Sequence, residues 1–182
     1  MRVRAASAED APAIAAIYAP YVEASYISFE MEPPDAEEIG RRMASGGDLY
    51  PWLAAVDEDD ALLGYAYASP FRPRPAYRYA VETTVYVRAS EHGRGIGAAL
   101  YRPLIAMLRD QGFTQAFAAI SLPNEGSVRL HERFGFRSAG RYEKVGWKCG
   151  RWWDVGLWQL TLAEREEPGE LRPWREVAAS RE

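Results

Sequence analysis

One carboxylate stands inside a run that otherwise has the pattern of a buried strand. Within residues 81–87 (VETTVYV), three valines and Thr83 alternate with Glu82, Thr84 and Tyr86, as in a β-strand with one covered face. A carboxylate is costly to bury unless it has a partner or a function. Partial burial would also raise its pKa toward the range that suits a general base. Glu82 is therefore a candidate base, and a structural carboxylate that binds backbone or arginine groups is the alternative.

A glycine-rich segment, with Gly93, Gly95 and Gly97, follows this strand and leads into a helix. That helix has an apolar residue at every fourth position: Ile96, Leu100, Leu104 and Leu108. The order of strand, glycine loop and helix directs bare backbone N–H groups and the positive end of a helix dipole at a phosphate. The spacing from Gly93 to Ala98 also satisfies a relaxed dinucleotide fingerprint, but no acidic residue closes the next strand. A tight turn without a ligand is the structural alternative.

Three arginines, Arg72, Arg74 and Arg78, precede the strand that carries Glu82. Guanidinium groups suit a carboxylate or a phosphinate, because they offer paired donors to paired oxygens. The segment 70–75 is rich in proline and cannot lie inside a strand or helix. A solvated arginine loop is the alternative to an anion-binding loop.

The scaffold that positions these residues is expected to be a single α+β domain. The length of 182 residues and the 48% hydrophobic content suit one buried core. The net charge of -4 argues against nucleic acid as a partner. No signal peptide or membrane-spanning stretch is predicted, and Cys149 is the only cysteine, so the expected setting is the cytoplasm. Metal ligation is not expected.

Periodicity and turn residues place the elements of this domain. Strands are predicted at 2–5, 52–56, 62–68, 81–87, 115–122, 137–146 and 152–162. Helices are predicted from a cap at Ser7, at 36–44 after Asp35, at 96–111 and from Asn124 to Phe134. The sheet is expected to be mostly antiparallel, with helices on both faces. Residues 1–163 form the domain, and the charged tail 164–182 is expected to be mobile, with Trp174 able to dock.

The segment His92-x-x-Gly95-x-Gly97 resembles the pyrophosphate-binding motif of the GNAT superfamily of acetyl-CoA-dependent N-acetyltransferases. That motif usually opens with Gln or Arg, and His92 stands in its place. A second resemblance lies at Asn124, Ser127 and His131, which share one helix face. Within the superfamily the chain is most similar to the phosphinothricin and methionine sulfoximine acetyltransferases. This narrower resemblance is carried by residues 28–30, 50–53, 81–87 and 122–124 and by His131-Glu132.

The resemblance implies a GNAT fold with a splayed central strand pair and acetyl-CoA as co-substrate. The residues implied to bind the cofactor are Val85, Tyr86, Val87, Gly93, Arg94, Gly95, Ile96, Gly97, Ala98, Asn124 and Ser127. The residues implied to line the acceptor site are Phe29, Glu30, Arg72, Pro73, Arg74, Thr83 and Thr84. Homodimers are common among relatives.

The same resemblance assigns chemical roles. Glu82 would take the proton of an attacking amine, and backbone N–H groups near Val85 to Val87 would stabilise the oxyanion if a bulge leaves them unpaired. His131 would protonate the leaving thiolate, although Tyr86 or Tyr142 could do so. Cys149 lies on a predicted hairpin turn and makes a poor acyl-enzyme nucleophile, so direct transfer is expected.

The expected function is acetylation of the α-amino group of a small amino-acid-like acceptor such as phosphinothricin, methionine sulfoximine or methionine sulfone. One alternative is a peptide or protein N-acetyltransferase, which an arginine-lined closed pocket would disfavour. The other is a CoA-binding sensor without turnover, against which Glu82 argues.

Overall fold

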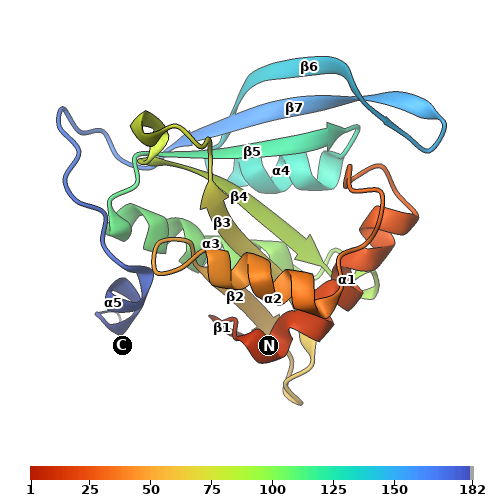
Figure 1. Ribbon diagram of the computed structural model, residues 1–182, viewed down its shortest axis with the longest axis horizontal. Coiled ribbons are helices and arrows are strands. Elements are labelled where there is room, and N and C mark those ends of the chain that lie inside the picture. The colour runs from red at the N-terminus through yellow and green to blue at the C-terminus, as the bar shows by residue number, and fades with distance from the viewer. Residues whose placement is uncertain (181–182) are drawn as a thin grey trace.

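The computed structural model describes residues 1–180 and shows one mixed sheet with helices on both of its faces (Figure 1). Within those residues the sheet has the order β1-β2-β3-β4-β5-β7-β6, and only β4 and β5 run parallel. The strands are β1 (Arg2–Ala5), β2 (Trp52–Val56), β3 (Leu62–Pro70), β4 (Ala80–Val87), β5 (Gln115–Leu122), β6 (Arg137–Lys148) and β7 (Arg151–Thr161). The α-helices are α1 (Ala11–Glu23), α2 (Ala36–Ser45), α3 (Ile96–Gln111), α4 (Glu125–Arg133) and α5 (Trp174–Ala179). No helix in this part of the chain has the length and hydropathy needed to cross a bilayer.

The expected elements and the expected fold class are confirmed. Asp35 caps α2, because its side chain accepts from the backbone N–H of Glu38. Gly112, at φ 102, ends α3 in the left-handed conformation. The turn between β6 and β7 uses Cys149 and Gly150, both at positive φ, as a tight hairpin requires.

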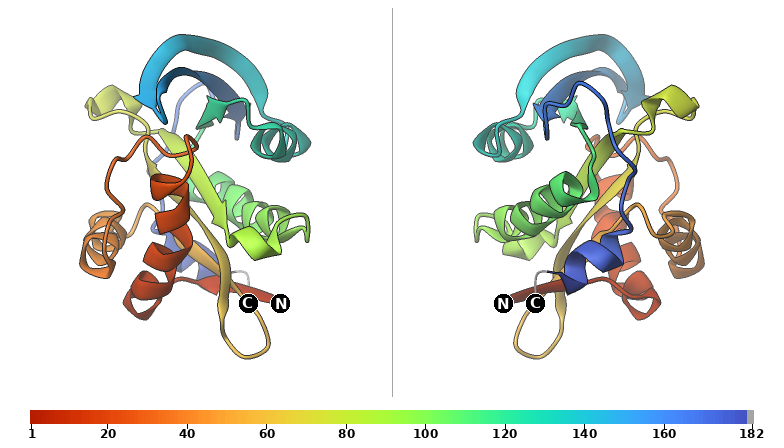
Figure 2. Two further views of the ribbon diagram at one scale, coloured as in Figure 1. Left: turned by 90° about the vertical axis from the view of Figure 1, so that its right-hand side faces the viewer. Right: turned by 90° about the vertical axis from the view of Figure 1, so that its left-hand side faces the viewer.

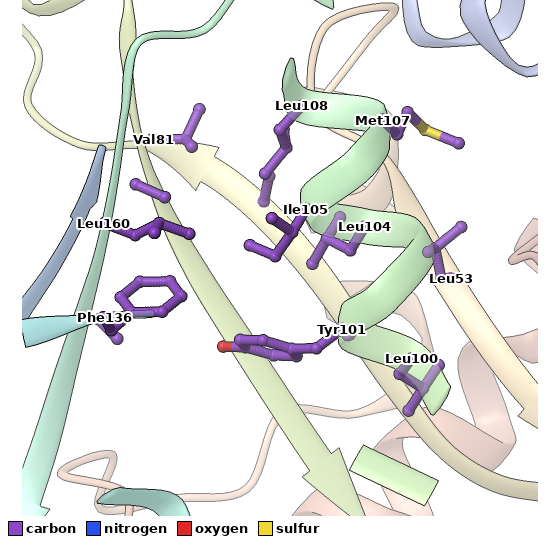
Figure 3. Close-up of a cluster of buried hydrophobic side chains, with 14 of the residues drawn as sticks. Leu53, Val81, Leu100, Tyr101, Leu104, Ile105, Met107, Leu108, Phe136 and Leu160 are labelled. Atoms are coloured by element: carbon purple, nitrogen blue, oxygen red, sulfur yellow. The ribbon is translucent and has the colours of Figure 1, made fainter. Parts of the chain in front are cut away.

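The two faces of the sheet bury two separate apolar clusters. On one face α3 packs its stripe of Leu100, Leu104 and Leu108, each 0% exposed, against β2, β3 and β4 (Figure 3). On the other face α1 and α2 cover a second cluster that includes Ile14 and Ile39. Figure 2 shows these helices as layers on opposite sides of the strands. The regular spacing of apolar residues in each helix is what directs one stripe inward.

The central feature of the sheet is the separation of β4 from β5. The two strands pair only from Ala80 to Glu82, although β4 continues to Val87 and β5 to Leu122. The strands then diverge, as Figure 1 shows. The expected bulge is absent from β4, because its register with β3 is continuous from Val81 to Val87. Divergence from β5, rather than a bulge, therefore leaves one edge of β4 open.

The end of the chain, where a mobile tail with Trp174 able to dock was expected, contains a short helix. Residues 174–179 form α5, which packs against α3, and Val177 is 1% exposed. The backbone N–H of Arg172 donates to the carbonyl of Gln111, and that of Trp174 donates to Asp48. Apolar burial and these bonds hold the segment to the domain, as the expectation for Trp174 allowed. Residues 181–182 lie outside the described part of the chain.

Candidate active site

Glu82 lies at the vertex where β4 and β5 separate, since it is the last residue of β4 that pairs with β5. Its side chain is half-buried and, within residues 1–180, takes part in no hydrogen bond or ion pair. Burial raises the pKa of Glu82, and the nearby Arg72 guanidinium acts in the opposite direction. An unpaired carboxylate with a raised pKa is suited to accept a proton.

Beyond Glu82, alternate residues of β4 direct their backbone groups into the opening. The N–H of Arg88 donates to the carbonyl of Leu63 on the β3 side, in continuation of the β3–β4 register. Because the direction of hydrogen bonding alternates along a strand, Val85 and Val87 face away from β3. The Val87 carbonyl supports this orientation, because it accepts a hydrogen bond from the Tyr21 hydroxyl of α1 at 2.5 Å. The N–H groups of Val85 and Val87 are thus available to a ligand in the opening.

The glycine loop before α3 has the shape of an anion cradle. Gly93 and Gly95 both have φ of 79°, a region that favours glycine, and a Cβ atom built on either would meet nothing within 4 Å. The backbone is therefore open to a ligand at both positions. The first turn of α3 begins at Ile96 and includes Gly97 and Ala98, so its N–H groups face the same loop. These observations fit a pyrophosphate group.

The side chains in and next to this loop contact other parts of the protein. The Ile96 side chain belongs to the core, at 2% exposed, so only its backbone can serve a ligand. Arg94 pairs with Glu91 and is otherwise exposed. His92 turns toward the end of α1, where its Nε2 lies 2.6 Å from the Tyr21 hydroxyl and 3.2 Å from the Val87 carbonyl. His92 therefore anchors the loop to β4 and α1.

Asn124 and Ser127 lie at the start of α4, where β5 ends. The Asn124 Oδ1 accepts from the backbone N–H of Ser127 at 3.2 Å and so caps the helix. Its amide NH2 group remains able to donate to a ligand.

His131 is buried on α4 and contacts a tyrosine that the sequence did not single out. Its Nδ1 lies 2.7 Å from the Ser127 carbonyl, which only accepts, so Nδ1 carries the proton. Nε2 then accepts from the Tyr101 hydroxyl at 2.8 Å. That hydroxyl also lies 3.3 Å from Oγ1 of Thr83, the residue after Glu82. Burial lowers the pKa of His131 and raises that of Tyr101, so both groups are neutral near pH 7.

The sequence did not predict Tyr101 as a site residue, because it lies on the apolar face of its helix. It is 0% exposed, as a core residue would be, and only its hydroxyl reaches the strand. Figure 3 shows the ring extending from α3 over β4 toward Phe136. The two tyrosines considered as alternatives lie elsewhere. Tyr86 packs against Tyr18 on the face covered by α1, and Tyr142 is exposed on β6.

The opposite face of β4 carries the residues expected at an acceptor site. Glu82 and Thr84 project there, and Thr84 partly offsets the rise that burial causes in the pKa of Tyr67. The charges of Arg42, Glu82 and Glu30 also affect the pKa of Tyr67, so these groups lie near the same tyrosine. Thr83 points to the other face and bonds the Phe117 carbonyl of β5 at 3.2 Å.

Glu30 is not a free carboxylate. Arg42 donates to both of its oxygens, at 2.7 and 3.0 Å, and Tyr18 donates at 2.9 Å. The Arg42 hydrogen bonds hold the pKa of Glu30 below its usual range. Phe29, beside it, is exposed and covers the backbone of Gly146 on β6. Glu30 therefore fixes its own segment, and Phe29 is the neighbour left to meet a ligand.

The three arginines of the loop that precedes β4, here called the arginine loop, have different surroundings. The Arg72 guanidinium lies 5.0 Å from the centre of the Phe71 ring and acts on Glu82. Phe71 in turn stacks on Phe117 of β5, with 4.0 Å between ring centres. Arg74 and Pro73 are exposed, and the Arg74 side chain takes part in no hydrogen bond or ion pair within residues 1–180. Arg78 is occupied, because it donates to the Tyr79 hydroxyl.

A cavity of about 530 Å³ lies between the start of α4 and the β6–β7 hairpin. Its lining includes Asn124, Arg129, Arg141 and Trp152 but no residue of β4. Of the residues assigned to the cofactor and acceptor sites it includes only Asn124, so it meets the cofactor site only at the start of α4.

Comparison with known proteins agrees with this geometry. Residues 3–157 match the family described as acetyltransferase (GNAT) domain. The chain is 37% identical to the phosphinothricin N-acetyltransferase of Streptomyces viridochromogenes over 97% of its own length and 96% of the relative's. It is 38% identical to the L-methionine sulfoximine/L-methionine sulfone acetyltransferase of Pseudomonas paraeruginosa, with 88% and 94% covered. A solved phosphinothricin acetyltransferase of Sinorhizobium meliloti, in complex with AcCoA, superposes with a TM-score of 0.89 at 37% identity and covers 93% of each chain.

Proposed function

The chain belongs to the GNAT acetyltransferase family, and on this premise we propose that it acetylates the α-amino group of a small amino-acid-like acceptor. Acetyl-CoA is the co-substrate and supplies the acetyl group as an activated thioester. The observation that carries the proposal is the position of Glu82. A half-buried carboxylate without a partner lies at the vertex of the open strands, between the cofactor cradle and the acceptor face.

The cofactor would be held by backbone groups on one side of the opening. The N–H groups around Gly93, Gly95 and Gly97 would bind the pyrophosphate, because the loop presents bare backbone and the α3 dipole adds positive potential. The N–H groups of Val85 and Val87 would bind the pantetheine arm in place of the missing β5 neighbour. Asn124 would donate its side-chain amide to the same arm.

The chemical step needs a neutral amine near the vertex. Glu82 would take the ammonium proton, directly or through a water molecule, as the nitrogen attacks. The donors on the open edge of β4 would stabilise charge on the carbonyl oxygen. The departing sulfur would meet the Tyr101–His131 pair, in which the transferable proton is on the Tyr101 hydroxyl and His131 aligns it.

The acceptor is proposed to be a compact zwitterion such as phosphinothricin, methionine sulfoximine or methionine sulfone. The curated relatives named above act on these compounds, and their similarity extends over nearly the whole chain. Arg72 acts on Glu82, and Arg74 lies in the same loop of a protein of net charge -4, so positive potential there is local. Phe29, which is 37% exposed, would supply an apolar contact.

A second copy of the chain is the proposed partner, in the cytoplasm where acetyl-CoA is available. Four large apolar side chains on the β6–β7 hairpin are 47% to 57% exposed: Tyr142, Val145, Trp147 and Trp152. A group of this kind is typical of a protein interface. Trp147→Lys should give a monomer by light scattering if this hairpin forms the contact, and an unchanged dimer would exclude it.

The test of the function is an acceptor screen with acetyl-CoA and detection of the released thiol. Methionine sulfone and phosphinothricin should be acetylated, and peptides of similar size should be poor. Preferred turnover of peptides would favour a peptide acetyltransferase. Binding of acetyl-CoA without turnover of any amine would favour a sensor instead.

A further inference from the structure

A buried lysine on β6 joins three backbone carbonyls from a distant part of the chain. The Nζ of Lys148 lies 2.6 Å from the carbonyl of Val22, 2.7 Å from that of Ser28 and 2.7 Å from that of Glu30. The residue is 7% exposed, although lysine is seldom buried. Three donors meet three acceptors, so the group is fully satisfied by one conformation of the segment after α1.

Each acceptor has a reason to bind a cation. Val22 lies in the last turn of α1, where carbonyl groups have no helical partner and the dipole is negative. That last turn has no basic residue of its own. Ser28 and Glu30 lie on either side of Phe29, so one ammonium group fixes the backbone both before and after that ring.

The same strand supplies a seat for the Phe29 ring. A Cβ atom built on Gly146 would lie 2.2 Å from Cε2 and 2.3 Å from Cζ of Phe29. The ring therefore rests directly on the Gly146 backbone, two residues before Lys148. Any side chain at this position would displace it.

The segment held in this way borders the acceptor face. The Ile27 carbonyl accepts from the Ser121 hydroxyl of β5, and the Tyr26 hydroxyl donates to the Pro123 carbonyl. Glu30 is tied to Arg42 near Tyr67 and Glu82. Figure 1 shows the segment that follows α1 beside the far ends of β5 and the β6–β7 hairpin.

We propose that Lys148, with Gly146, is a positioning residue that fixes the Ser28–Glu30 segment and thereby sets the affinity for the acceptor. The effect on KM rests on the proposed function, whereas the effect on the segment does not. Neither residue touches the glycine loop or the open edge of β4, so cofactor binding is independent of them.

The experiment compares Lys148→Met with Lys144→Met, which changes the only other lysine of the chain, an exposed residue of the same strand. Hydrogen–deuterium exchange at residues 24–35 should rise at least about tenfold in Lys148→Met, because three charge-assisted hydrogen bonds are lost. The KM for the acceptor should rise by about ten- to a hundredfold, while the KM for acetyl-CoA stays within about twofold. Lys144→Met should match the wild type in all three measurements.

Unchanged exchange in folded Lys148→Met would overturn the proposal, and so would an equal rise in both KM values. If the wild-type protein acetylates no amine, the proposed function fails, and the exchange measurement alone decides whether Lys148 fixes the segment.

Gly146→Ala provides a second route if Lys148→Met does not fold. It should raise the acceptor KM in the wild-type background and have no further effect in Phe29→Ala, where no ring is present to displace. The same rise in both backgrounds would overturn the role of Gly146 as the seat of Phe29.

Discussion

The Tyr101 hydroxyl lies 2.8 Å from Nε2 of His131, so a hydrogen bond joins α3 to α4 beside the point where β4 and β5 separate. The bond from Nδ1 of His131 to the Ser127 carbonyl fixes the tautomer, which makes Tyr101 the donor. The pair therefore holds one transferable proton in a defined direction.

If this pair protonates the departing thiolate, Tyr101→Phe should lower kcat by about a hundredfold, at the lower end of the range for general acid catalysis. His131→Ala should have a similar effect, and the double variant should be no slower, because the two residues act as a unit. Steady-state kinetics with saturating acetyl-CoA would measure this. Tyr142→Phe, at an exposed tyrosine, is the control. Additive losses would assign separate roles to the two residues.

Glu82→Gln keeps the shape of the side chain and removes the base. The value of kcat should fall by about 10²–10⁴-fold, whereas acetyl-CoA binding should be retained. Calorimetric titration would check the binding and a thiol-release assay the rate. Glu143→Gln, an exposed position on β6, should leave both unchanged. Full activity of Glu82→Gln across the pH range would show that Glu82 is not the base and has only a structural role.

The pH dependence of kcat/KM should report Glu82. Since the deprotonated form acts and burial raises the pKa, activity should be lost on acidification at a higher pH than for an ordinary glutamate. Arg72 lowers that pKa, so Arg72→Ala should move the acid limb to still higher pH. An acid limb that stays in place would show that another group controls it.

Arg74 is an exposed residue of the arginine loop, and its side chain takes part in no hydrogen bond or ion pair within residues 1–180. Arg74→Ala should raise the acceptor KM by about ten- to a hundredfold with a smaller change in kcat, the pattern of lost uniform binding. On the wild type, methionine sulfone should be a better acceptor than its amide by a similar factor, and Arg74→Ala should reduce the difference. Equal efficiency for acid and amide would exclude a carboxylate contact and favour peptide acceptors.

Gly97 tests the cradle, because a Cβ atom there would already lie 3.0 Å from Cδ2 of Leu130. Acetyl-CoA should raise the Tm of the wild type, since it binds only the folded state. Gly97→Glu should abolish that shift by adding bulk and negative charge at the phosphate site. Gly169→Glu, in the segment before α5, should retain it. An unchanged affinity in folded Gly97→Glu would contradict the assignment of the loop.

Much of this protein could be predicted from local patterns. Alternation along 81–87 predicted the strand and the outlying carboxylate, and the four-residue spacing from Ile96 to Leu108 predicted α3. The glycines predicted the loop, because only their backbone adopts its angles without strain. These signals lie within a few residues of one another, so a single stretch of chain contains them.

The remaining features depend on which distant elements meet. Tyr101 has the sequence pattern of a core residue, and only the approach of α4 gives its hydroxyl a partner. Glu30 is occupied because α2 brings Arg42 to it. Lys148 lies 126 positions from Val22 in the sequence, and no local pattern predicts that its ammonium group binds a carbonyl in the last turn of α1. Side-chain type and spacing determine which face of a helix or strand a residue lies on. Tertiary packing determines which partner the side chain contacts there, because each of these contacts joins two segments that are far apart in the sequence.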